Sequence, residues 1–145
     1  MNWKYEAIDK LKQYGAKKRS LRAIPEEISR LEAAMVSIRS AASDGTPAQG
    51  GGSGREDAYL SNIVRREELK RSLEQTRKWV DFVNEGLDYI AEDERMILDR
   101  FYINPAKGNV ERLCAELGCE QATVYRRREQ ALRSFTMSLY GCMEI

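Results

Sequence analysis

Side chains that can hydrogen-bond to nucleic-acid bases and phosphates are concentrated near the carboxyl end of the chain, over residues 121–133. This run holds four arginines and one glutamate, a net charge of +3. Gln can pair with adenine, Arg can pair with guanine or a phosphate, and Ala and Thr methyl groups can contact the thymine methyl. The predicted contact residues are Gln121, Ala122, Thr123, Tyr125, Arg126, Arg127, Arg128 and Arg133.

Contacts to bases and contacts to phosphates predict different roles for these residues. We expect Gln121 and Arg126 to carry sequence preference, because they would lie near the start of a helix that enters the major groove. We expect Arg127, Arg128 and Arg133 to add general affinity through phosphates, and Tyr125 to contact sugar or phosphate.

Other site chemistry is not predicted. The chain has no histidine, which removes imidazole as a general base and as the commonest metal ligand. Cys114 and Cys119 fall on apolar helix positions, and no second Cys or His pair completes a zinc site, so we expect both thiols to be buried, reduced and metal-free. The glycine-rich run at 50–54 follows no predicted strand and is not typical of a phosphate-binding loop. The sequence predicts no enzyme, no metal and no cofactor.

Composition indicates a helical, cytoplasmic protein. Charged residues make up 32% of the chain while the net charge is only +1, which is typical of long solvated helices. No apolar run approaches the ~18 residues of a membrane span, and the polar start does not predict a secretory leader. The odd number of cysteines favours reduced thiols in the cytoplasm. We expect neither a membrane nor a small-molecule substrate as a partner.

Three short helices over residues 93–135 are predicted to position the contact residues. Asp93 is expected to cap the first helix and Asn109 the second, and the stretch 104–108 separates the two. Gly118 is expected to end the second helix in the left-handed conformation. The third helix turns its apolar side inward, at Val124, Ala131, Leu132 and Phe135.

Two apolar seven-residue repeats upstream predict an antiparallel coiled-coil hairpin. Pro25 fits the first turn of the earlier helix, and residues 42–56 lack large apolar side chains, which predicts a flexible loop. A separate helix over residues 3–18 is expected to pack on the hairpin as a third strand. Upstream of Leu69 the repeat weakens at Asn62 and Arg66, so a shifted register is expected, held by Leu60, Ile63 and Val64.

Residues 87–135 resemble region 4 of bacterial sigma factors. The resemblance rests on Arg100-Phe101-x-Ile103, Val110-x-x-Leu113, Leu117-Gly118-Cys119, Thr123-Val124 and Ala131-Leu132. A hairpin with a Gly/Ser-rich tip ahead of this module is similar to phage-encoded regulators of Gram-positive bacteria, of the ArpU (autolysin-regulator) type. The resemblance implies transcription control of phage or prophage genes, through double-stranded DNA and RNA polymerase.

Three positions depart from that family. Glu120 stands where Ser or Thr commonly precedes the recognition helix, Ala122 where Glu is frequent, and Arg127 where an apolar residue is frequent. These departures put the usual promoter element in question.

Together these patterns predict an all-α protein with two domains. Residues 1–92 form the helical coiled-coil hairpin with its flexible loop 42–56, and residues 93–145 form a sigma-region-4-like helix-turn-helix that binds DNA. The expected function is sequence-specific DNA-binding transcription regulation, and a homodimer is compatible with the hairpin. Two alternatives remain open: a DNA-recognition subunit such as a small terminase-like protein, which would form a ring, and a coiled-coil adaptor that does not bind DNA.

Overall fold

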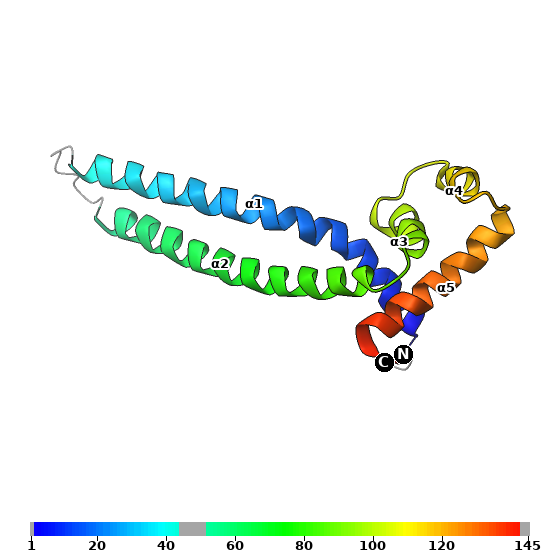
Figure 1. Ribbon diagram of the computed structural model, residues 1–145. Coiled ribbons are helices and arrows are strands. Elements are labelled where there is room, and N and C mark those ends of the chain that lie inside the picture. Colours follow the sequence, from blue (N-terminus) through cyan, green and yellow to red (C-terminus); the bar gives the residue numbers. More distant parts are fainter. Residues whose placement is uncertain (1, 44–51, 143–145) are drawn as a thin grey trace. The chain divides into compact units, whose positions relative to one another are not determined.

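The computed structural model describes residues 2–43 and 52–142, and over this part of the chain the fold is all-helical with no strand (Figure 1). The all-α prediction is confirmed. The elements are α1 (Trp3–Ser43), α2 (Gly52–Asp88), α3 (Glu92–Leu98), the π-helix η1 (Asp99–Ile103), α4 (Asn109–Leu117) and α5 (Gln121–Tyr140). None of the described helices is both long enough and apolar enough to cross a membrane.

Contacts divide the chain into two compact units. Residues 19–77 form one, called here the hairpin unit, and residues 1–18 with 78–145 form the other, called the core unit. Each unit therefore contains part of α1 and part of α2. The sequence predicts a boundary between two folding domains at residue 92. The division into compact units does not test that boundary, which stays a prediction.

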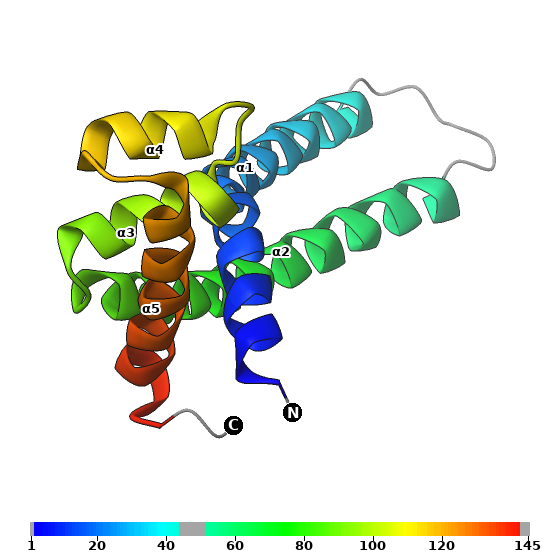
Figure 2. The same ribbon diagram turned by 90° about the vertical axis from the view of Figure 1, so that its right-hand side faces the viewer.

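Within the hairpin unit, α1 and α2 run antiparallel (Figures 1 and 2). The side-chain amide of Asn62 donates to the backbone oxygen of Leu31 at 2.8 Å, and Arg39 Nε donates to the Tyr59 hydroxyl at 2.6 Å. The predicted apolar repeats lie along the two paired helices. Their members are buried or half-buried: Ile24, Ile28, Leu31, Met35 and Ile38 on α1, and Leu69, Leu73 and Thr76 on α2.

The predicted register shift upstream of Leu69 is wrong. Asn62 keeps its place between the helices with 7% of its surface exposed, and its side-chain oxygen accepts a hydrogen bond from Arg66 Nε at 2.8 Å. Because both ends of the amide are hydrogen-bonded, the polar residue can be buried at low cost. The apolar residues that were expected to replace it are exposed instead: Leu60, Ile63 and Val64.

Two further predictions about α1 are wrong. Pro25 lies inside the helix rather than in its first turn, and residues 3–18 continue into the hairpin rather than forming a separate helix. A proline removes the hydrogen bond to the carbonyl four residues earlier, which here belongs to Leu21. Pro25 lies on an exposed side of α1, where water can reach the backbone, and the paired turns on both sides hold the helix together.

The predicted loop 42–56 is wrong at both ends. Residues 42–43 belong to α1 and residues 52–56 to α2, while residues 44–51 lie outside the described part of the chain. Extending an existing helix adds a hydrogen bond for each residue fixed and needs no new nucleus, so poor helix formers can join it. The bond between Tyr59 and Arg39 holds the first turns of α2 in place.

The core unit buries apolar residues from α1, α2, α3, α4 and α5. Helices α3 and α4 both lie against α5 (Figures 1 and 2). Five leucines, three other aliphatic residues and one aromatic residue are almost completely excluded from water: Leu11, Val83, Leu87, Ile97, Leu98, Leu113, Val124, Leu132 and Phe135, joined by Ala131. This core holds the carboxyl-terminal helices.

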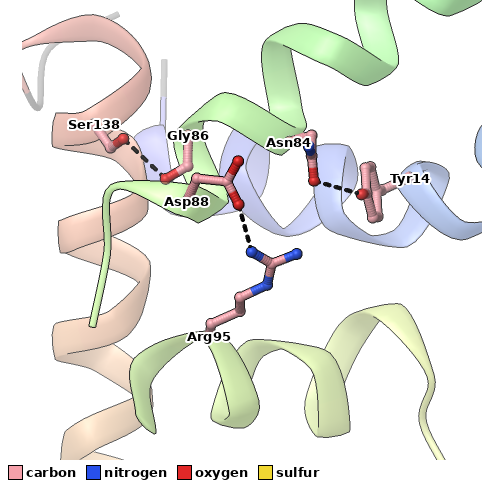
Figure 3. Close-up of polar contacts among 6 residues, drawn as sticks. All are labelled: Tyr14, Asn84, Gly86, Asp88, Arg95 and Ser138. Carbon is pink, nitrogen blue, oxygen red and sulfur yellow. Dashed lines mark hydrogen bonds and ion pairs between the residues drawn. The ribbon is translucent and has the colours of Figure 1, made fainter. Parts of the chain in front are cut away.

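Polar contacts tie the end of α2 to its neighbours (Figure 3). The Tyr14 hydroxyl donates to Asn84 Oδ1 at 3.1 Å, and Arg95 pairs with Asp88 at 2.6 Å. Ser138 Oγ of α5 donates to the backbone oxygen of Gly86 at 2.9 Å. Gly86 is the close-approach point, because a Cβ atom there would lie 2.5 Å from Leu139 Cδ2.

Replacing Gly86 should therefore destabilise the protein. We expect Gly86→Val to lower the free energy of unfolding by about 1–3 kcal/mol, because the added side chain must displace Leu139 and Phe135. Gly54→Val in the same helix is the matched control, since no atom lies within 4 Å of its Cβ position. The control should be neutral or slightly stabilising, because Val has the higher helix propensity. Chemical denaturation of both variants measures the difference, and equal stabilities would contradict the close approach.

Candidate nucleic-acid interface

A tight turn joins α4 to α5. Gly118 ends α4 with φ +63°, and the backbone N–H of Cys119 donates to the backbone oxygen of Cys114 at 3.2 Å. A left-handed residue at this position is strained for any side chain with a Cβ atom, which explains the glycine. The prediction for Gly118 is confirmed. Glu120 follows in extended conformation, and its side chain makes no capping hydrogen bond.

A small apolar cluster fixes how α5 is rotated about its axis. Ile97 of α3, Leu113 of α4 and Val124 of α5 are all fully buried and pack together. The predicted inward side of α5, which also includes Ala131, Leu132 and Phe135, is confirmed. Half-buried residues complete the cluster around these three: Met96, Phe101, Cys114, Leu117 and Cys119.

The prediction that both cysteines are buried is wrong. Cys114 and Cys119 form no disulfide, but both are half-buried rather than fully buried. They lie at the rim of the cluster, where α4 is only nine residues long and leaves its neighbours partly open to water. The apolar role expected for both residues holds, since both pack against the buried cluster.

Most of the predicted contact residues are exposed on α5. Thr123 and Arg128 are half-buried, and Arg126 Nη2 donates to Thr123 Oγ1 at 3.2 Å. Val124 points into the core. Residues 122, 126 and 133 lie two residues before it and two and nine residues after it, so they are on the opposite side of the helix. The exposed members are Gln121, Ala122, Tyr125, Arg126, Arg127 and Arg133.

Acidic residues of the chain itself lie beside two of the four arginines. Arg127 Nη1 lies 4.0 Å from Asp93 Oδ2, and Arg128 Nη2 lies 3.6 Å from Glu129 Oε1. Glu129 also pairs with Lys4 of α1 at 2.6 Å. The positive charge of α5 is thus partly balanced within the core unit, most strongly on the sides that flank the buried face.

Arg128 lies in an aromatic cluster that the sequence did not reveal. Its guanidinium lies 5.0 Å from the ring centre of Phe101 and 5.1 Å from that of Tyr125, and the two rings are 6.1 Å apart. Only 26% of its side chain is exposed, and its Nε is buried without a hydrogen-bond partner. The geometry assigns Arg128 a packing role between η1 and α5. The i, i+3 spacing of Tyr125 and Arg128 was the available signal.

The π-helix η1 presents Phe101 to this cluster. It ends where the Asn104 backbone N–H donates to the backbone oxygen of Asp99 at 2.7 Å, and the Asn104 side chain donates to Asp99 Oδ1 at 2.8 Å. Arg100 Nη2 also donates to Glu116 Oε1 at 3.1 Å, which links η1 to α4. These bonds hold the wide turn of η1 against its neighbours.

Both predicted helix caps are wrong. Ala91 rather than Asp93 precedes α3, and the Glu94 side chain accepts a hydrogen bond from the Ala91 backbone N–H at 3.3 Å. Gly108, with φ +76°, precedes α4, whereas Asn109 is already helical. The Asn109 side chain instead donates to the backbone oxygen of Arg100, because it is buried beside η1.

Tyr102 lies at the edge of the same region. Burial raises the pKa of its phenol above the ordinary 10.0, and nearby Glu129 adds to the rise while Arg128 and Lys4 oppose it. The phenol is therefore uncharged at neutral pH. Because the folded pKa is the higher one, its contribution to stability is present below about pH 10 and is lost as the pH rises through the folded value.

A family model described as "Protein of unknown function (DUF1492)" matches residues 37–136. The chain belongs to this family. The matched range contains α2, α3, η1, α4 and most of α5, and with them all eight predicted contact residues. The comparisons with curated proteins and with solved structures gave no match.

In this DUF1492 chain, Arg128 should matter for stability more than an exposed arginine of the same helix. We expect Arg128→Ala to lower the free energy of unfolding by about 1–2 kcal/mol, because it removes a cation held between two rings. Arg133→Ala is the matched control: it makes the same change in helix propensity at an exposed site and should change stability by less than ~0.5 kcal/mol. Thermal or urea unfolding measures both. Similar losses in the two variants would remove the packing role.

Proposed function

We propose that this DUF1492 chain is a sequence-specific regulator of transcription that binds double-stranded DNA, with α4 and α5 acting as a helix-turn-helix. One observation carries the proposal. Burial of Val124 against Ile97 and Leu113 turns the opposite side of α5 to water, and that side holds Arg126 and Arg133. A short helix, a turn through a left-handed glycine and a second helix with an exposed basic side is the arrangement that DNA-binding helix-turn-helices use.

In this proposal, the first turns of α5 enter the major groove. Gln121 and Arg126 read base edges, with Arg126 held by its hydrogen bond to Thr123, and Ala122 contacts a thymine methyl. Arg133 lies two turns further along the exposed side and neutralises a phosphate. Tyr125 has 38% of its surface exposed and supports Arg128 from one side while its outer edge is open to a sugar or phosphate.

The four arginines have unequal roles in the proposal. Arg127 is exposed, and its 4.0 Å contact with Asp93 is long, so it can exchange this partner for a phosphate at little cost. Arg128 is held between Phe101 and Tyr125, so it positions the helix rather than supplying a free cation. Glu120 is exposed just ahead of α5 and would repel nearby phosphates, which lowers the affinity expected for DNA that Gln121 contacts.

The resemblance to region 4 of sigma factors supports a role in transcription. We propose a phage or prophage regulator on that basis, with RNA polymerase as a second partner. A coiled-coil adaptor is the second candidate, and the acids beside Arg127 and Arg128 favour it, because they let these arginines serve the fold alone.

DNA titrations test the proposal. A preferred duplex is first selected from a randomised pool with the wild-type chain, and binding to it and to a random duplex is then measured by fluorescence anisotropy at several salt concentrations. We expect Arg126→Ala to lower the preference for the selected duplex by about 1–3 kcal/mol, since it removes a base contact. Arg133→Ala should weaken both duplexes and reduce the salt slope by about one unit.

Arg65→Ala in α2 serves as the control, because it removes an exposed arginine of the hairpin unit and should leave both affinities unchanged. Equal losses on both duplexes for Arg126→Ala and Arg133→Ala would show that Arg126 does not read bases. A wild-type chain that binds neither duplex at low salt would contradict DNA binding and favour the adaptor.

A further inference from the structure

The hairpin unit carries an apolar strip that no other described part of the unit covers. It consists of Val36 on α1 and Leu60, Ile63 and Val64 on α2, with exposed fractions of 62%, 60%, 37% and 53%. Contiguous exposed aliphatic side chains on a soluble helix pair mark an interaction surface more often than a solvated face. The strip therefore calls for a specific partner.

These four residues lie on one side of the helix pair. The positions of the seven-residue repeats that face the other helix form the seam between α1 and α2. Val36 and Leu60 occupy equivalent positions beside this seam, and Ile63 lies between Leu60 and the seam residue Arg66. A hollow of about 520 Å³ continues the strip at one end, lined by Ile38, Arg39, Arg55, Glu56, Tyr59 and Leu60. Since Leu60 shares this hollow with Arg39 and Glu56, residues of α1 and α2 on this side are neighbours.

Asn62 explains why the strip stays outside. The amide bonds of Asn62 to Leu31 and Arg66 hold α2 in the register that turns Leu60, Ile63 and Val64 away from α1. A register that buried these three residues would remove Asn62 from its hydrogen bonds. The exposure is thus built into the pairing of the two helices, and it is available to a second molecule.

Charges at the ends of the strip indicate which partner fits. On α1, Val36 lies between Glu32 and Arg39, and on α2, Ile63 lies midway between Glu56 and Lys70. All four charged residues are exposed on the side of the strip. Each helix therefore has an apolar centre with unlike charges at its two ends, and such a helix is complementary to a second copy of itself that runs in the opposite direction, as a twofold axis allows.

We propose that two copies of the chain associate through this strip, strip against strip, in an antiparallel four-helix bundle. Helices of the two hairpins then cover the four aliphatic side chains of each copy. If like helices meet, they run in opposite directions, and Glu32 faces the second copy's Arg39 while Lys70 faces its Glu56. If α1 meets the second copy's α2, Arg39 faces the second copy's Glu56. Unlike charges meet in both cases, so the interface is favourable electrostatically as well as through apolar burial.

The mass of the full chain in solution tests the proposal without DNA, so its outcome is independent of the function proposed above. We expect sedimentation equilibrium to give a dimer for the wild type. Leu60→Glu combined with Val64→Glu should raise the dimer Kd by about tenfold or more, the equivalent of ~1.4 kcal/mol. Because both side chains are mostly exposed in one copy, circular dichroism and the unfolding transition of the monomer should be preserved.

Ala58→Glu combined with Ser61→Glu is the matched control. Both residues are exposed on the same helix, on the other side of the seam, so the dimer should be unaffected. Val36→Cys and Ile63→Cys report the contact directly under oxidation: we expect a covalent dimer from one variant alone or from their mixture. Ser37→Cys, on the far side of α1, should behave like the wild type.

A wild-type chain that is monomeric at every concentration overturns the proposal. A closed ring larger than a dimer overturns it as well and favours the terminase-like alternative. A dimer that tolerates Leu60→Glu with Val64→Glu as well as it tolerates the control pair shows that the copies meet elsewhere, and so does the absence of oxidative cross-links above the wild-type level.

Discussion

Burial of Val124 against Ile97 and Leu113 is the contact on which the carboxyl-terminal part of the fold depends. A helix can rotate about its axis, and a rotation of one residue would move every arginine of α5 by about 100°. The cluster removes that freedom, because only the side bearing Val124, Ala131, Leu132 and Phe135 is apolar throughout. The left-handed turn at Gly118 then brings α4 back beside α5. The positions of the polar residues follow from this packing rather than from contacts of their own.

A polar constraint has the corresponding role in the hairpin unit. Asn62 is buried between α1 and α2, and its two hydrogen bonds are lost if the helices slide. With an apolar residue at this position the two helices would pair more tightly, but their register would be less well defined. As a consequence of this fixed register, the neighbouring aliphatic residues Leu60, Ile63 and Val64 face water. The same amide therefore sets the internal pairing and creates the surface for which a second copy is proposed.

The sequence predicted what depends on periodicity. The all-helical fold, the inward residues of α5 and the Gly118 turn were predicted, because apolar spacing and a left-handed glycine are local signals. Predictions about helix ends and single side chains were less successful. Pro25 is tolerated inside α1 because the pairing on both sides outweighs one missing hydrogen bond. Neither Asp93 nor Asn109 caps a helix, because α3 and α4 begin directly after Ala91 and Gly108 and already include both residues.

The site itself was only partly predictable, for a related reason. Whether an arginine is available to a partner depends on what lies beside it, and neighbours of Arg127 and Arg128 come from α3 and η1. Their distance in sequence from α5 hides these neighbours from any local pattern. In the sequence, the four arginines form one basic run. In the fold, Arg126 and Arg133 face outward, Arg127 lies beside Asp93, and Arg128 packs against aromatic rings.

This separation bears on how strongly one copy could hold DNA. With a net charge of only +1, the chain has no general attraction for polyanions, so affinity must come from local cations. Arg126 and Arg133 face outward without an acidic neighbour among the described ion pairs, and a surface with so few available cations releases few counterions from DNA. A second copy held through the hairpin strip would add a second set of these residues to the assembly, and linked sites that engage one target bind more tightly than either site alone. In the proposed dimer, the affinity for DNA would therefore come from two copies, and each α5 would supply only part of it.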